Sequence, residues 1–326
     1  MRIVLISLLF CNFIFADDYS FDMDEIEVKT YEYKGYLKAE QKHQKTQNND
    51  TLNSTYGEAQ VDFKYFRNDY TLNSQFQANH SNINNSEKNI YTTNQLYLNY
   101  KYSSNHSVNI GKESLKWGKG YFFNPVAFVD RPKDVNDPEA SKEGYNILNY
   151  KYNKSYNSDL KNFNFNMVYV KDTSSLALKT YFLYLDTDID IVYFTDDELS
   201  DKIGIDFSKN IETNFEIHGE FAKEQDGNNS YLVGLKYLTI NDLTITSEYF
   251  KRLDKKEYFI NKFSLKEPFG IVYSTVYYKK NLNVDDKLHQ DTLGGIYSFR
   301  NNITVDISYN KNVSNDILWS KVIWYF

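Results

Sequence analysis

The last 25 residues, Asn302–Phe326, decide the fold, and they run NITVDISYNKNVSNDILWSKVIWYF. Apolar and polar residues alternate along this stretch, which is the period of a β-strand that presents one face to an apolar phase. The apolar residues that share a face are Ile303, Val305, Ile307 and Tyr309 in the first half, and Leu318, Val322, Trp324 and Phe326 in the second. The chain therefore ends in two amphipathic strands whose final residue is aromatic.

About 18 segments with the same period can be found between residue 30 and the end of the chain. Each is close to the ~9–11 residues that a strand needs to cross a membrane. The predicted fold is all-β, a transmembrane antiparallel up-and-down β-barrel of about 18 strands, with 16 as the lower alternative. A soluble β-sandwich is the rival fold, but it needs many Gly and Pro turns. The chain has only 4 Pro and 13 Gly.

The connections between these segments provide a second test. In a barrel with both ends in the periplasm, tight turns follow the even strands and longer loops follow the odd ones. Short links such as Asn68-Asp69 and Asp186-Thr187 follow even strands. Longer polar stretches follow odd strands, at 42–55, 81–89, 116–142, 224–229 and 281–289. We therefore expect external loops at these five places, the third being the longest.

Met1–Ala16 has the order of a secretory signal peptide: Arg2, an apolar run, and a small residue before Asp17. It is shorter than the ~20 apolar residues of a membrane-spanning helix. Its removal takes away Cys11, the only cysteine, so disulfides and thiolate metal sites are excluded from the mature chain. Residues 17–29 are then expected to form a short periplasmic segment, and residues 30–326 the barrel.

The composition supports a barrel and argues against a nucleic-acid partner. Without the leader, 36 basic residues face 44 acidic ones, whereas nucleic-acid binding requires clustered Lys and Arg. A mean hydropathy of −0.62 is low for a membrane protein, yet 17% of the residues are aromatic. A barrel reconciles the two values, because only every second residue faces lipid and aromatic residues gather at the interfaces.

Taken together with the leader and the alternating strands, Trp324 and the terminal Phe326 resemble the closing strand of Gram-negative outer-membrane β-barrels. The resemblance implies export to the outer membrane and recognition of this strand by the barrel-assembly machinery. Lipid, lipopolysaccharide and small polar solutes are the other partners that it implies. Further copies of the chain, in a homo-oligomer, remain an open alternative.

The 116–142 stretch differs from the other connections because it holds three of the four prolines and many aromatic residues. Gly111-Lys112-Glu113, Trp117-Gly118 and Asn124-Pro125 resemble a pattern of porin-like barrels of the alginate-export type. A long third loop also resembles general porins, in which it folds into the pore as a constriction. The constriction residues that this implies are Trp117, Tyr121, Phe122, Phe123, Asn124, Pro125, Phe128, Asp130 and Arg131. The alternative is that these aromatic residues only cover the barrel mouth.

The polar faces of the strands supply the candidate pore lining. The residues assigned to it are Asp62, Lys64, Glu113, Glu216, His218, Glu220, Glu248 and Asp306. Acids outnumber bases among them, and carboxylates in a pore favour cations. The alternative is that cross-barrel pairs neutralise many of these charges and leave a weakly selective pore.

No motif in the chain points to chemistry. The five histidines do not share a metal-ligand spacing, so no metal site or cofactor is predicted. Nothing resembles the active-site segments of outer-membrane phospholipases or omptin proteases, so we predict no enzyme. The sequence favours a channel for passive diffusion of small polar solutes, weakly cation-selective. The alternative is a barrel that binds or exports one hydrophobic or carbohydrate ligand with periplasmic partners.

Overall fold

The computed structural model describes residues 29–48, 50–197, 201–225, 227–252, 256–267, 274–283, 288–299 and 302–326. The predicted signal peptide, 1–16, and nearly all of the predicted segment 17–29 lie outside these ranges. Within them, no helix is long and apolar enough to cross a membrane. The unit described below is Tyr31–Phe326.

This unit is built from 18 β-strands. Their bounds are β1 (Tyr31–Thr46), β2 (Thr51–Arg67), β3 (Tyr70–Ile83), β4 (Ser86–Lys101), β5 (His106–Glu113), β6 (Tyr145–Ser155), β7 (Leu160–Val170), β8 (Ser175–Tyr184), β9 (Thr187–Thr195), β10 (Lys202–Glu212), β11 (Phe215–Glu224), β12 (Asn229–Leu238), β13 (Leu243–Lys251), β14 (Glu257–Lys266), β15 (Ser274–Asn283), β16 (Leu288–Ser298), β17 (Ile303–Asn312) and β18 (Asn315–Tyr325).

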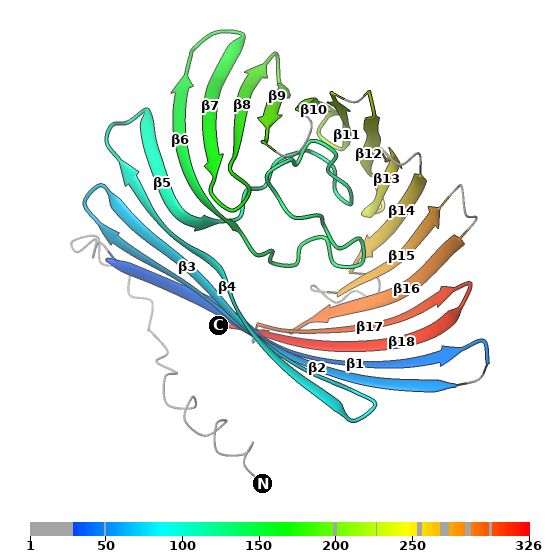
Figure 1. Cartoon of the computed structure of the whole chain (residues 1–326). Coiled ribbons are helices and arrows are strands. Elements are labelled where there is room, and N and C mark those ends of the chain that lie inside the picture. The colour runs from blue at the N-terminus through cyan, green and yellow to red at the C-terminus, as the bar shows by residue number, and fades with distance from the viewer. Residues whose placement is uncertain are drawn as a thin grey trace, which may run out of the picture. The chain divides into compact units, whose positions relative to one another are not determined.

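Every strand pairs antiparallel with its neighbours in sequence, and β1 also pairs with β18, so the sheet closes into a barrel (Figure 1). The closing pair runs in register from Tyr36 opposite Tyr325 to Thr46 opposite Asn315. Closure removes both edges of the sheet. The prediction of an antiparallel barrel with 18 strands is confirmed, and the 16-strand alternative is set aside.

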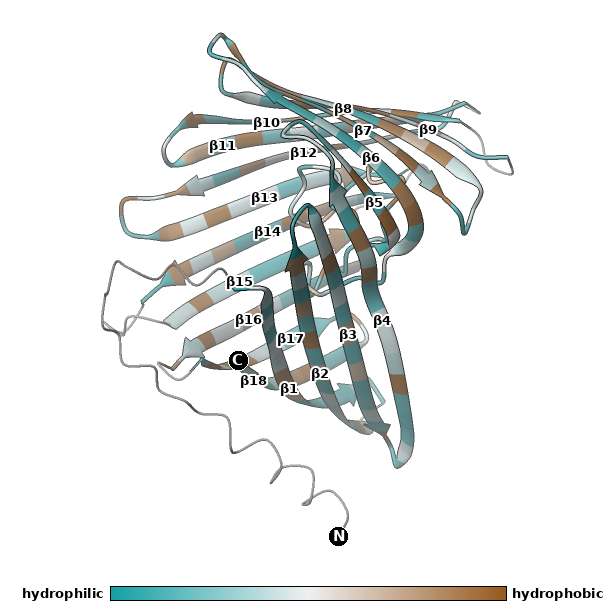
Figure 2. Ribbon diagram, turned by 90° about the vertical axis from the view of Figure 1, so that its left-hand side faces the viewer, coloured by the Kyte–Doolittle hydropathy of each residue, from teal (hydrophilic) through white to brown (hydrophobic). Residues whose placement is uncertain are grey.

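The alternation in the sequence becomes two different faces of the wall. Large apolar side chains remain exposed on the outside, for example Val233 at 61%, Leu293 at 58% and Ile307 at 55%. Their neighbours along the strands point inward and are mostly polar. Figure 2 shows hydrophobic and hydrophilic positions alternating along the strands. The barrel therefore keeps its apolar surface outside and its polar groups inside.

The first two predicted external loops are wrong in extent. Most of 42–55 and 81–89 continues β1 to β4 as two long hairpins, and the turns are confined to the ranges 47–50 and 84–85. These four strands are 14 to 17 residues long. Cross-strand hydrogen bonds hold the polar ends together, with His43 Nδ1 2.6 Å from Asn53 Oδ1. The ends are polar on both faces, so the alternation by which strands are recognised is absent there.

The last residue closes the barrel against a glycine of the first strand. Gly35 N donates to the Phe326 carbonyl at 2.9 Å, and Phe326 N donates to the Gly35 carbonyl at 3.0 Å. A Cβ at residue 35 would lie 2.6 Å from Phe326 Cζ, far inside a normal contact. A glycine in a strand commonly marks such a close approach. The aromatic ring of Phe326 thus packs directly over the backbone of β1.

Candidate functional site

The connection between β5 and β6 lies inside the barrel (Figure 1). It covers residues 114–144, two residues more at each end than the predicted 116–142. We call it the inner loop. Its contacts with the wall involve β5, β6 and every strand from β8 to β16. A loop without secondary structure needs partners for its backbone groups, and side chains of the inner wall supply them.

Glu220 on β11 holds the first turn of the inner loop. Its Oε1 accepts the backbone N–H groups of Lys119 at 2.6 Å and Gly120 at 2.7 Å. The same atom accepts Asn124 Nδ2 at 3.1 Å, while Oε2 accepts the N–H of Val126 at 3.2 Å. Glu220 is only 4% exposed. A buried carboxylate requires such donors, so this residue and the loop backbone stabilise each other.

Glu248 on β13 does the same for the next residues of the loop. Its oxygens accept the backbone N–H groups of Tyr121, Phe122 and Phe123, the last two at 3.0 and 3.3 Å. His218 Nε2 on β11 lies 3.1 Å from Glu248 Oε1. Both side chains are fully buried. The loop backbone from residue 119 to residue 126 is therefore wrapped around two carboxylates of the wall.

Two glycines of the wall make room for these contacts. A Cβ at Gly204 on β10 would lie 2.8 Å from Val126 Cγ1 of the loop. A Cβ at Gly234 on β12 would lie 2.1 Å from His218 Nε2 and 2.9 Å from Glu248 Cγ. Neither position tolerates a side chain without movement of its neighbours. An isolated glycine within a strand pattern is the sequence signal that could have located this face.

The apolar residues of the inner loop pack against the wall. Trp117 and Val129 belong to one buried cluster with inward residues of β6 to β9. The wall residues of this cluster are Ile147, Val168, Val170, Ala177, Val192 and Phe194. Further along the wall, the Phe123 ring stacks on Phe250 with centroids 4.7 Å apart. This packing explains why β8 and β9 are apolar on both faces.

A buried ion cluster lies beside this packing. Lys119 Nζ is 3.0 Å from Asp190 Oδ2 and 3.9 Å from Asp206 Oδ1, and Lys179 Nζ is 3.1 Å from Asp190 Oδ2. The two aspartates are directly opposed on β9 and β10. Burial opposes the charge of Lys119, but the nearby carboxylates outweigh it and raise the pKa of its ammonium group. Sequence reasoning missed these residues because nothing in the pattern placed them together.

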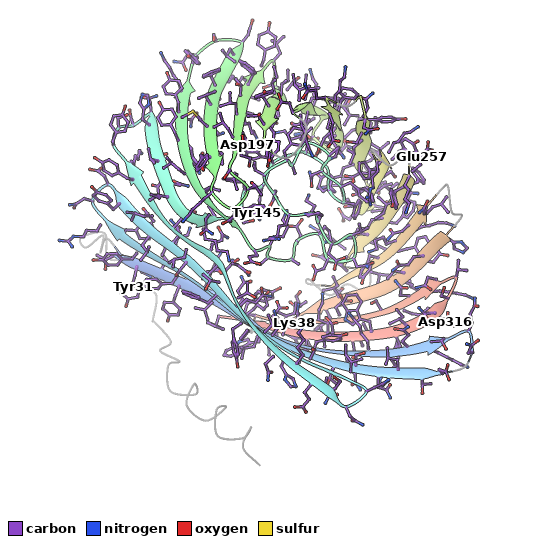
Figure 3. All side chains as sticks on the ribbon, viewed as in Figure 1. Tyr31, Lys38, Tyr145, Asp197, Glu257 and Asp316 are labelled. Atoms are coloured by element: carbon purple, nitrogen blue, oxygen red, sulfur yellow. The ribbon has the colours of Figure 1, made fainter. Side chains whose placement is uncertain are left out.

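Side chains of the loop itself hold part of its second half. Lys142 Nζ lies 2.5 Å from Asp130 Oδ2, and burial nevertheless raises the pKa of Asp130. Lys133 Nζ donates to the Gly120 carbonyl at 2.6 Å, and burial lowers the pKa of this lysine. The Arg131 guanidinium lies over the ring of Tyr145. Figure 3 labels Tyr145 beside the loop.

The far end of the inner loop, around Asn136, contacts two strands late in the chain, β15 and β16. Lys279 Nζ on β15 donates to the Val135 carbonyl at 3.1 Å and to Asn136 Oδ1 at 3.2 Å. Gln290 Nε2 on β16 donates to the same Asn136 atom at 3.2 Å. The loop therefore extends from β5 across the interior to β16 before it returns to β6.

The predicted pore-lining residues fall into two groups. Glu216, His218, Glu220 and Glu248 lie at the inner loop; Glu216 accepts the Tyr121 hydroxyl at 2.9 Å.

The remaining four belong to the wall itself. Asp62 accepts the Gln75 amide at 2.8 Å, Glu113 pairs with Lys151 at 3.0 Å, and Asp306 with Lys321 at 3.5 Å. Lys64 lies two residues after Asp62 on the same face of β2. No group of three or more metal-ligating side chains occurs in the part of the chain that the structure describes.

A closed antiparallel barrel with a loop folded into its interior is a porin-like architecture. No protein-family model matches the chain, and no curated protein matches its sequence.

The solved structures that share this fold include mutants of the porin of Rhodopseudomonas blastica. One superposes with a TM-score of 0.55 at 10% identity, over 91% of this chain and 100% of the porin. A second gives 0.55 at 12% identity, and a triple mutant gives 0.53 at 11%, each with the same coverage. At this identity the likeness concerns the fold, which is that of a porin-like barrel.

Proposed function

We propose that the protein is an outer-membrane channel through which small polar solutes diffuse passively. The observation that carries the proposal is the closed barrel with exposed apolar side chains outside and polar ones inside. A continuous apolar outer face of this kind is costly in water and stable in lipid. Lipid and lipopolysaccharide are then its surroundings. The proposed activity involves no chemical step and no cofactor.

The expected route to that membrane is export with the leader 1–16, followed by insertion by the barrel-assembly machinery. Residues 17–29 would remain at the periplasmic side, where β1 begins in the proposed orientation. Trp324 and Phe326 are the proposed assembly signal, and both lie on the outer face with Leu318 and Val322.

Two variants separate assembly from stability at this end of the chain. Deleting Phe326 is expected to lower the amount of protein in the outer membrane, because the signal and its packing are lost together. Gly35→Val keeps the signal but places a side chain against Phe326, so the refolded barrel should lose roughly 1–3 kcal/mol. Denaturant unfolding in detergent and membrane levels are the two measurements. Gly57→Val is the control, since a Cβ there meets only His80 at 4.0 Å. Normal membrane levels without Phe326 would refute the assembly role.

We further propose that the inner loop narrows the channel. It extends from β5 to β16 inside the barrel, and both of its halves are held by hydrogen bonds. The alternative is a barrel that presents the aromatic residues of the loop to a hydrophobic or carbohydrate ligand. That alternative needs exposed aromatic side chains. Trp117 and Phe122 are 7% and 4% exposed, and Phe123 is stacked on the wall. Planar-bilayer recording tests the channel directly, since a barrel without conductance would contradict it.

Weak cation selectivity is proposed from the charges of the loop. Asp134, Asp137 and Glu139 form no ion pair within 4.0 Å with the described lysines or arginines, and they act on Lys133, Lys262 and Lys279 only through space. Replacing them with Asn, Asn and Gln should move the reversal potential in a salt gradient toward anions, most clearly at low ionic strength. Asp186→Asn, at the exposed β8–β9 turn, should leave it unchanged. A wild-type preference for anions would rule out the proposal.

A further inference from the structure

One row of directly opposed residues crosses the inner face of seven strands. It runs from β11 to β17 through Glu216, Lys236, Thr246, Lys262, Lys279, Thr292 and Asn310. Three of its members are lysines, and Lys262 and Lys279 are immediate cross-strand partners. Opposed Cβ atoms lie ~5 Å apart, and like charges at this spacing are destabilising. The row therefore contains an unfavourable pair that the fold alone does not require.

No carboxylate compensates this pair by contact. In the described ranges, no carboxylate oxygen lies within 4.0 Å of the ammonium group of Lys236, Lys262 or Lys279, whereas Lys321 on β18 pairs with Asp306 at 3.5 Å. Asp306, Glu139 and Asp137 interact with Lys262 through space without forming an ion pair, and Asp134 and Asp137 interact with Lys279 in the same way. The one acid of the row, Glu216, is already bonded to the Tyr121 hydroxyl at 2.9 Å.

Within the part of the chain that the structure describes, the three lysines also retain hydrogen-bond donors without an acceptor. An ammonium group has three N–H donors. Lys279 uses two of them, on Val135 O and Asn136 Oδ1. Lys236 Nζ lies 3.4 Å from the Tyr121 hydroxyl, and Lys262 is over the ring of Tyr277 at 5.7 Å. The hydroxyl of Thr246 lies between Lys236 and Lys262 in the row. Cationic and hydroxyl donors aligned in this way suit an oxyanion.

We infer that Lys236, Lys262 and Lys279 form a binding site for the oxyanion group of a solute, a phosphate or a carboxylate. The inference rests on the proposed channel and adds the class of solute that it retains. The site is local, because it occupies one row beside the end of the inner loop. The proposed weak cation selectivity concerns small ions and the charge of the whole lumen, so the two proposals are compatible. The solute's anionic group supplies the counter-charge in direct contact that the row lacks, since the nearby carboxylates act on the lysines only through space.

The test measures binding and conduction separately, with inorganic phosphate, gluconate and glucose as probes. Titration calorimetry on the detergent-purified barrel should detect phosphate or gluconate binding and none for glucose. Lys262→Gln should weaken it roughly tenfold, the loss of one charge-assisted contact. Lys262→Arg should restore most of it, and Lys236→Gln should weaken it in the same direction. Lys64→Gln removes an equal charge from β2 and should change binding less than about twofold.

The outcomes distinguish the two proposals. Binding of phosphate alone or of gluconate alone supports the site and names the oxyanion. Equal effects of the Lys262→Gln and Lys64→Gln changes, or no anion binding by the wild type, overturn the site. If the Lys262→Gln variant does not fold, the effect of Lys236→Gln on anion binding tests the site instead. A barrel that binds the anion but shows no conductance in a planar bilayer contradicts the channel and leaves the site intact.

Discussion

Replacing Trp117–Glu139 with a short Gly/Ser linker is expected to raise the single-channel conductance severalfold. This segment extends across the interior from β5 to β16, and it carries the bulkiest side chains of the inner loop. The narrowest part of a pore dominates its resistance, so removing the segment should widen the conducting path. β5 and β6 pair directly with each other from His106 to Glu113, so we expect the wall to keep its register without the segment.

The same replacement uncovers apolar wall residues, among them Val168, Ala177 and Val192, which are fully buried under the loop. Some loss of stability is therefore expected as well. Gel migration before and after boiling shows whether the shortened barrel still folds. An intact barrel with unchanged conductance would place the loop outside the conducting path. A chain that no longer folds would show that the loop mainly braces the wall.

The strand order could be predicted from the sequence because one physical rule governs it. A wall between lipid and a polar lumen forces a period of two, which Ile303, Val305 and Ile307 display plainly. The rule fails where both faces meet water, as at the ends of β1 to β4. It also fails where both faces are apolar, as on β8 and β9, whose inner side packs on the inner loop.

The site depends on strand register, which periodicity does not supply. Lys236, Lys262 and Lys279 are separated by 17 or more positions in the chain, and only the pairing of β12 to β15 aligns them. The same holds for Asp190 and Asp206. The alternation of apolar and polar residues correctly placed Glu220 and Glu248 on the inner face. It could not reveal that the loop backbone would cover them. Their assignment as pore lining therefore needs a separate test.

Changing Glu220 and Glu248 together to Gln is expected to release the inner loop from the wall. The two carboxylates accept the backbone N–H groups of six loop residues and also the Asn124 amide. A Gln side chain offers one acceptor and turns an NH₂ donor toward the remaining N–H groups. Leaving buried donors unsatisfied costs about 1–3 kcal/mol at each site. The released loop should be cleaved faster by trypsin at Lys119 and Lys133, and the open-channel current should become noisier.

Glu58→Gln is the matched control, because it makes the same change on the inner face of β2, where Glu58 pairs with Lys38 at 2.8 Å. It should alter neither the trypsin cleavage rate nor the current noise. Carboxylates that only line an open pore would give the opposite pattern in the double variant. The reversal potential would move toward anions while the loop stayed resistant to protease. That result would show that Glu220 and Glu248 line the permeation path. It would also show that they do not anchor the loop.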